Sequence, residues 1–174
     1  MAEDAVTQAS RKAMEMESQF WGCSQAVLGA LQEALNIGNT ESFRAGTILS
    51  AGVARRGETC GALIGALMAL GIACGRSRMQ DRDDYNQAME HAQDVVDAFK
   101  DGIGAQYDIP EPLQSTLCPE IQTHLYGRAF AFADPSERKA FNDAGGHAPD
   151  ACPRVCAIAA AVTARKILEL RQNR

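Results

Sequence analysis

The residues of this sequence best suited to chemistry are its six cysteines, which are Cys23, Cys60, Cys74, Cys118, Cys152 and Cys156. In a reducing compartment, thiols bind metals, carry out redox chemistry or lie inert in a core rather than forming structural disulfides. Cys118 and Cys152 each precede a proline, which is favoured at the first position of a helix. Cys60 follows the turn-like stretch "RRGET", and Cys23 follows "FWG" at the start of an apolar pattern. These four cysteines are therefore predicted to lie at helix N-termini, with Cys118 and Cys152 at N-caps.

A helix N-terminus favours the ionised form of a thiol. Its free backbone N–H groups and the helix dipole stabilise a nearby anion by about 0.3–1 kcal/mol. Cysteines in such settings have pKa values of roughly 3.5–7.5, and the thiolate is both the nucleophile and the metal ligand. If the four helix starts converge, they form a cage of four thiolates lined with N–H donors. For any single cysteine, the alternative is a small apolar packing residue.

The other two cysteines have different settings. Cys74 is near the C-terminal end of its predicted helix, where the dipole disfavours a thiolate, so a structural role is expected. Cys156 is four residues after Cys152 and shares its helix face. For Cys156 a core role is favoured, with an extra ligand or a resolving thiol as the alternatives. The histidines are isolated in the sequence, which favours surface or core positions; they are His91, His124 and His147.

Several familiar motifs are absent or incomplete. The sequence has no CxxC or CxxCH, so a thioredoxin-type dithiol and a c-type haem have no local signature. "GETCGALIG" lacks the lysine and Ser/Thr of a P-loop. The apolar run 61–73 is shorter than the roughly 18–20 residues that span a bilayer. Small residues at four-residue spacing, Gly61, Gly65 and Ala69, instead predict a buried helix with a close neighbour.

The elements that must position the cysteines are predicted to be helices. Apolar residues recur at spacings of three and four, without sustained alternation. Helices are expected over 59–73, 118–130 and 152–172, and over 81–100 with Met89, Val96 and Phe99 on one stripe. A further helix is expected from Thr40 as its N-cap. Residues 1–174 are thus predicted to form one all-α domain, a compact bundle of about six to seven helices.

Charge and composition narrow the functional classes. The net charge is −5 with 22 % charged residues, so no basic excess exists for nucleic acid. The opening "MAEDAVTQ" has acids where a secretory signal has basic residues, which predicts a cytoplasmic protein without a membrane span.

These motifs resemble those of a known family, the redox-active proteins named for a C_GCAxxG_C_C pattern. The core of the resemblance is "GETCGALIGALMALG", with "CSQAV" from Cys23, "CPE" from Cys118 and "CPRV" from Cys152 similar to the flanking cysteine segments. The resemblance covers about residues 20–78 and 115–168. The chain has Ala51 and Ala54 where the family is often glycine-rich. This departure affects the expected shape of the loop near Cys60 and leaves the set of four cysteines unchanged.

The resemblance implies a redox or metal-cluster role. Sequences related to this family also occur in split-Soret cytochromes, where an iron–sulfur site accompanies haem. The leading hypothesis is that an iron–sulfur cluster of unspecified type is bound by Cys23, Cys60, Cys118 and Cys152 for electron transfer. Such four-thiolate ligation suits [2Fe–2S] and [4Fe–4S] centres. The alternatives are a metal-free thiol–disulfide redox protein and a zinc- or copper-binding module that uses the same sulfurs. The expected partner is a redox protein, and a homodimer is left open.

Overall fold

The protein is helical throughout its described length. The structure, a computed structural model, describes residues 2–110 and 112–173. Within these residues it has eight α-helices, one 3-10 helix (η1) and no strand: α1 (Ala2–Phe20), α2 (Cys23–Leu35), α3 (Thr40–Ala45), η1 (Thr47–Leu49), α4 (Gly61–Cys74), α5 (Arg82–Gln106), α6 (Cys118–Tyr126), α7 (Pro135–Asp143) and α8 (Cys152–Gln172). The all-α prediction is confirmed, with slightly more helices than expected. None of the described helices combines the length and apolar content needed to cross a membrane.

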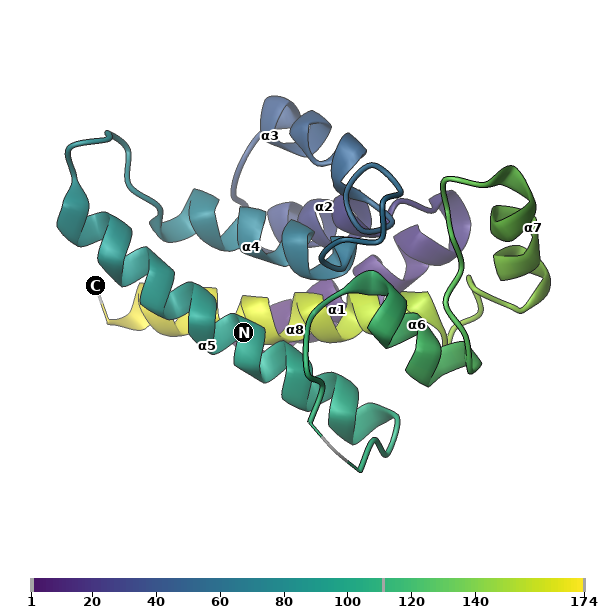
Figure 1. Cartoon of the computed structure of the whole chain (residues 1–174). Helices are drawn as coiled ribbons and strands as arrows, with labels where there is room; N and C mark the ends of the chain where they lie inside the picture. Colours follow the sequence, from purple (N-terminus) through teal and green to yellow (C-terminus); the bar gives the residue numbers. More distant parts are fainter. Residues whose placement is uncertain (1, 111, 174) are drawn as a thin grey trace.

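The core forms around α8, which packs against α1, α2, α4 and α5 (Figure 1). Its alanine-rich sequence allows this, because small side chains let several helices approach one axis. Ala159, Ala160 and Ala164 are fully buried. The facing stripe of α1 carries Val6, Ala9 and Ala13 at spacings of three and four, all buried. The helices α6 and α7 cover one end of this bundle (Figure 1).

The glycines of α4 allow close packing against α2, as the four-residue spacing predicts. A Cβ atom added at Gly65 would lie against the backbone carbonyl oxygen of Ser24, well inside van der Waals contact. Only a residue without a side chain fits there, so Gly65 sets the distance between α2 and α4. Gly71, on the same helix, has open space where its Cβ would be.

Two helix boundaries near the predicted elements differ from expectation. Asn39, rather than Thr40, is the N-cap of α3, because its side chain accepts a hydrogen bond from the Ser42 backbone N–H at 2.9 Å. The helix predicted over 118–130 ends at Tyr126, where Gly127 adopts a φ of 72°. Glycine adopts this left-handed conformation without steric cost and commonly ends helices.

The helix α5 continues beyond the predicted end at residue 100. Its last turns contain Gly102, whose missing side chain leaves room for Ile158 of α8, and Ile103, which is fully buried. Packing on α8 therefore outweighs the low helix propensity of glycine. The buried stripe is Val95, Phe99 and Ile103, whereas Met89, expected on one stripe with Val96 and Phe99, is 44 % exposed.

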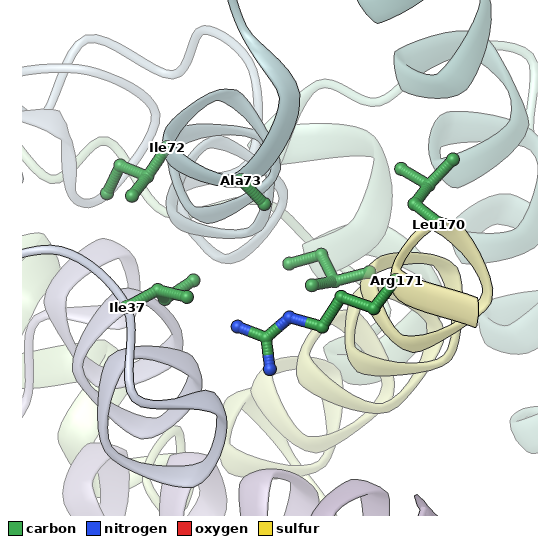
Figure 2. A pocket seen from close by; sticks show the side chains of 6 residues that line it. Ile37, Ile72, Ala73, Leu170 and Arg171 are labelled. Carbon is green, nitrogen blue, oxygen red and sulfur yellow. The ribbon is translucent and has the colours of Figure 1, made fainter. Parts of the chain in front are cut away.

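Three core helices, α2, α4 and α8, run in the same direction, so their C-terminal ends meet. Figure 2 shows the hollow between these ends, lined by Ile37, Ile72 and Leu170 among others. Arg171 reaches into it and donates a hydrogen bond to the Leu35 carbonyl oxygen at 2.8 Å. A cation is favourable here because the helix dipoles leave negative partial charge at C-terminal ends. The N-terminal ends of the same helices meet at the opposite end of the bundle.

Candidate functional site

Each of the four cysteines of the sequence hypothesis lies at the start of a helix. Cys23, Cys118 and Cys152 are the first residues of α2, α6 and α8, and Cys60 is the N-cap of α4. The prediction of N-terminal positions is confirmed, although Cys118 and Cys152 are one residue inside the helix rather than at the N-cap. The charge of one thiolate raises the pKa of another for the pairs Cys23–Cys60, Cys60–Cys118 and Cys118–Cys152, so the four thiols share one region.

A short backbone pairing holds Cys60 beside Cys118. Thr59 and Leu117 form an isolated antiparallel bridge between segments far apart in the sequence. The Cys60 N–H donates to the Thr116 carbonyl at 2.8 Å, and the Cys118 N–H donates to the Glu58 carbonyl at 2.9 Å. Because these bonds flank the bridge on both sides, they fix the starts of α4 and α6 next to one another.

The glycine after Cys60 makes room for the Cys23 sulfur. A Cβ atom built on Gly61 would lie 2.5 Å from Cys23 Sγ and 3.0 Å from the Leu49 carbonyl oxygen. Any side chain at this position would displace the sulfur or the loop before α4. The Cys-Gly pair of the motif is therefore explained by the close approach of the Cys23 sulfur to the first turn of α4.

One face of α6 supplies polar contacts to two sulfurs. Gln122 Nε2 donates to Cys118 Sγ at 3.3 Å, while Gln122 Oε1 accepts from the Phe130 N–H at 2.8 Å. One turn further along, the Tyr126 hydroxyl accepts the Cys152 N–H at 3.2 Å, and its single proton is shared between Cys152 Sγ at 3.4 Å and the Gly146 carbonyl oxygen at 3.2 Å. Gln122 and Tyr126 thus fix the orientations of Cys118 and Cys152.

The remaining two cysteines differ in position, because Cys156 lies with the other thiols and Cys74 does not. Cys156 is fully buried one turn after Cys152, and its Sγ lies 3.9 Å from the Cys23 carbonyl oxygen. The charges of Cys23, Cys60 and Cys152 all act on it, so the core position of Cys156 is also a position in the thiol cluster. Cys74 is the last residue of α4, at the opposite end of that helix, where its Sγ donates to the Leu70 carbonyl. The five clustered cysteines are free thiols.

The expectation of easily ionised thiols at these helix starts is wrong. Burial raises the pKa of Cys152 to about 12, against the opposing hydrogen bond of Tyr126. Burial also raises the pKa of Cys60, although the N–H groups of Ala62 and Leu63 oppose it. For Cys23, burial and then the negative charges of Glu17 and Cys60 raise the pKa. Desolvation therefore outweighs the stabilisation that helix N-termini give to the thiolates.

Sequence reasoning missed two residues, Glu17 of α1, whose charge acts on the thiols, and His147, which contacts Glu17. Glu17 is only 4 % exposed, and its charge raises the pKa of all five clustered thiols, those of Cys23, Cys60, Cys118, Cys152 and Cys156. His147 Nδ1 lies 3.3 Å from Glu17 Oε1. The His147 ring stacks on Trp21, with ring centroids 4.9 Å apart and planes 13° apart. The helical spacing of Glu17 from Ala13 and Ala9 was the available signal, because it continues their buried stripe.

The loop before α4 adopts a run of left-handed conformations. Residues 51–55 all have φ between 52° and 68°, and four of them are not glycine. Each non-glycine residue costs roughly 1–2 kcal/mol in this conformation. The two alanines at positions where the resemblance expects glycine, Ala51 and Ala54, are part of this run. The Ala51 N–H in turn lowers the pKa of Cys23, so the strained loop brings a donor to the cluster.

The donor set suits a thiophilic metal. Five thiols and a carboxylate gather around the N-terminal ends of four helices, and Glu17 Oε2 and His147 Nδ1 are buried without a hydrogen-bond partner among the described residues. Soft thiolate ligands select zinc, Cu(I) and iron–sulfur clusters. Over residues 2–110 and 112–173, no three Cys, His, Asp or Glu side chains are already placed to hold a metal ion. Binding would therefore require these side chains to move from the positions they occupy.

Fold and site together define an all-α protein with a buried cluster of thiols at converging helix starts. The chain belongs to the family described as "Putative redox-active protein (C_GCAxxG_C_C)", whose model matches residues 21–166. The match includes the five clustered cysteines and His147, whereas Glu17 lies outside it. No curated protein and no solved structure matches the chain significantly.

Proposed function

We propose that this member of a redox-active family binds an iron–sulfur cluster through Cys23, Cys60, Cys118 and Cys152 and transfers electrons. The observation that carries the proposal is the convergence of these four residues, each from the start of a different helix, in one region. Four cysteine thiolates are the usual ligands of [2Fe–2S] and [4Fe–4S] clusters. Such a cluster supplies one-electron chemistry when bound.

The charges of the site support binding of iron. In the metal-free protein, burial and mutual repulsion disfavour the ionised thiols. Positively charged iron would reverse this balance, because a coordinating thiol is deprotonated outright. The N-terminal ends of α2, α4, α6 and α8 add positive partial charge and backbone N–H groups around the same sulfurs. An anionic cluster with thiolate ligands would be stabilised by both.

The polar residues of α6 would tune the bound cluster. Gln122 and Tyr126 donate hydrogen bonds to Cys118 Sγ and Cys152 Sγ. Hydrogen bonds to ligand sulfurs are among the factors that set reduction potentials. Both side chains also accept a backbone hydrogen bond that orients them. Gln122 accepts the Phe130 N–H, and Tyr126 accepts the Cys152 N–H. These two residues therefore act on the potential rather than as ligands.

We further propose a compartment and a partner for this electron transfer. Free thiols persist in the reducing cytoplasm, which is the proposed compartment. Electron transfer requires a redox partner protein, which we propose to dock at the end of the bundle where the helix starts converge. The metal-free thiol–disulfide alternative needs easily ionised thiols, and burial raises the pKa of each clustered cysteine instead.

Anaerobic reconstitution tests the proposal. The protein is purified without oxygen, incubated with ferrous iron, sulfide and reductant, desalted, and analysed for iron, sulfide and visible absorption. The expected product is brown, with iron and sulfide in equal amounts and charge-transfer bands that dithionite bleaches. The matched control is Cys74→Ser, at the opposite end of α4, which should bind the same amount of iron. A colourless, iron-free protein would overturn the proposal, and a zinc- or copper-loaded protein that excludes iron would favour the metal-binding alternative.

A further inference from the structure

A groove with a basic lining lies between α1 and α8. Its volume is about 260 Å³, and its lining contains three arginines, two hydroxyl residues and no carboxylate from the described part of the chain. The arginines are Arg11, Arg154 and Arg165, and the hydroxyls belong to Thr7 and Ser10. The chain as a whole has a net charge of −5. The groove therefore gathers positive charge on an otherwise acidic protein.

One face of α8 supplies the arginines at the two ends of the groove. Arg154 and Arg165 are three helical turns apart, so their side chains leave α8 on the same side, about 16 Å from each other along its axis. Ala157 and Ala161 line the groove between them. Because these two side chains are methyl groups, the space between the arginines stays open.

A hydrogen bond between the helices places Arg11 at the Arg154 end of the groove. Ser10 Oγ donates to the Ala157 carbonyl oxygen at 3.1 Å, so this turn of α1 lies beside the first turns of α8. Arg11 follows Ser10 and lines the same groove. Its Nη1 also pairs with Glu15 at 2.8 Å, but both side chains are about half exposed, and such surface pairs contribute little. Arg11 can therefore exchange this partner for a ligand.

The guanidinium of Arg154 has a buried donor without an acceptor. Its Nε is inaccessible to solvent and has no hydrogen-bond partner among the described residues. A buried N–H of a charged group is costly to leave unpaired. Arginines often cover apolar surface with the stem while the charged head stays in water, and the exposed Arg165 fits that description. The buried Nε of Arg154 does not fit it, and a bound anion would supply the missing acceptor.

From these observations we propose that the groove between α1 and α8 binds a small phosphorylated molecule. The phosphate lies between Arg154 and Arg11 and accepts the Nε–H and a second N–H of Arg154. The planar fork of arginine matches phosphate oxygens in this bidentate way. The rest of the molecule lies over Ala157 and Ala161 and extends toward Arg165.

The size and charge of the groove favour this class of ligand. Its volume of about 260 Å³ is slightly below the roughly 300–1,000 Å³ of typical small-molecule sites, so it suits a small molecule. A phosphate monoester has three acceptor oxygens and up to about two negative charges, which two guanidinium groups and a hydroxyl complement better than they complement one carboxylate. The site uses no thiol, so it does not depend on the iron–sulfur proposal.

Calorimetric titration of the reduced, metal-free protein tests the site, with AMP as the phosphorylated probe and adenosine as the matched probe without phosphate. AMP should bind saturably with a Kd below about 1 mM, and adenosine should not bind. Arg154→Gln should weaken AMP binding about 10–100-fold, as expected for the loss of hydrogen bonds to a charged group. Arg154→Lys should also weaken it, because lysine keeps the charge but lacks the fork.

Two further variants serve as controls for charge and shape. Arg76→Gln removes the same charge between α4 and α5, where the guanidinium stacks on Tyr85, and should leave AMP binding unchanged. Ala161→Leu keeps every charge but fills the groove, so it should abolish binding. Circular dichroism melting of each variant shows that it is folded at the temperature of the titration.

Several results would overturn the site. These are no saturable AMP binding up to about 10 mM, adenosine binding as tightly as AMP, or equal losses in Arg154→Gln and Arg76→Gln, which would indicate general electrostatic attraction. Succinate binding as tightly as AMP would overturn the assignment to phosphate. Because iron is absent from these titrations, AMP binding by a protein that fails to take up iron would sustain the groove site and refute only the iron–sulfur proposal.

Discussion

Replacing Gly65 with alanine tests how closely α2 and α4 must pack to bring their cysteines together. The added Cβ would meet the backbone of Ser24, with the Ser24 Cα only 3.1 Å away. Because backbone atoms cannot rotate aside as a flexible side chain can, the two helices would have to separate. Such overpacking costs about 3 kcal/mol at the upper end of the usual range. Alanine recovers about 1 kcal/mol through its higher helix propensity.

The net expectation for Gly65→Ala is therefore a loss of about 2 kcal/mol in the free energy of unfolding. For a chain of this length, that corresponds to a fall of roughly 4–8 °C in the melting midpoint. The same helix provides the control, because a Cβ at Gly71 meets nothing within 4 Å. Gly71→Ala should gain about 1 kcal/mol from helix propensity alone.

The assay is thermal and urea unfolding of the reduced, metal-free proteins, followed by circular dichroism. The two alanine variants should differ by roughly 6–12 °C in their midpoints. If Gly65→Ala were as stable as Gly71→Ala, the close approach of α2 and α4 would be wrong. The position of Cys23 over the start of α4 would then lose its structural basis.

Three further predictions concern the surroundings of the thiols. Tyr126→Phe removes the hydrogen bond to Cys152 Sγ and leaves the Cys152 N–H without its partner, so it should cost about 1–3 kcal/mol in urea unfolding. In the reconstituted protein it should also lower the reduction potential measured by redox titration, and an unchanged potential would contradict a tuning role. Ala54→Gly relieves a left-handed residue with a φ of 52°, so the melting midpoint should rise by roughly 1–4 °C, whereas a fall would contradict the left-handed loop. Burial raises the thiol pKa values in the native state, so above about pH 8.5 the thiols ionise more readily in the unfolded chain than in the native protein. The free energy of unfolding is therefore unaffected by these thiols below about pH 8.5 and falls as the pH rises above it. Urea unfolding of the reduced, metal-free protein between pH 8 and 10 should show this loss, and Cys118→Ser should make its slope shallower by up to ~1.4 kcal/mol per pH unit.

Local sequence signals predicted the helix starts well. A cysteine before a proline, or after a turn-like stretch, marks a boundary through short-range conformational preferences, and Cys60, Cys118 and Cys152 follow that rule. The glycine spacing of α4 likewise indicated its packing face, because Gly65 contacts its neighbour as the spacing implies. These features depend on residues a few positions apart, which the sequence displays directly.

Features that depend on the register between helices were out of reach. His147 comes from the loop before α8 and meets Glu17 of α1 only in the folded chain. The place of Cys156 among the other thiols depends on which face of α8 meets the start of α2. The ionisation of the thiols was predicted in the wrong direction, because the helix dipole is visible from sequence whereas the larger desolvation is set by tertiary burial.

The order in which the chain is made adds a constraint on loading the site. Its clustered thiols are spread from Cys23 to Cys156, and the backbone bridge between Thr59 and Leu117 closes only after the long α5 has been synthesised. At roughly 5–20 residues per second, the ribosome releases the first thiol several seconds before the last. The helix α8, which carries Cys152 and Cys156, is also the one that the other core helices pack against. Assembly of the thiol cluster is therefore coupled to closure of the core, and a cofactor would enter a finished bundle rather than a nascent chain.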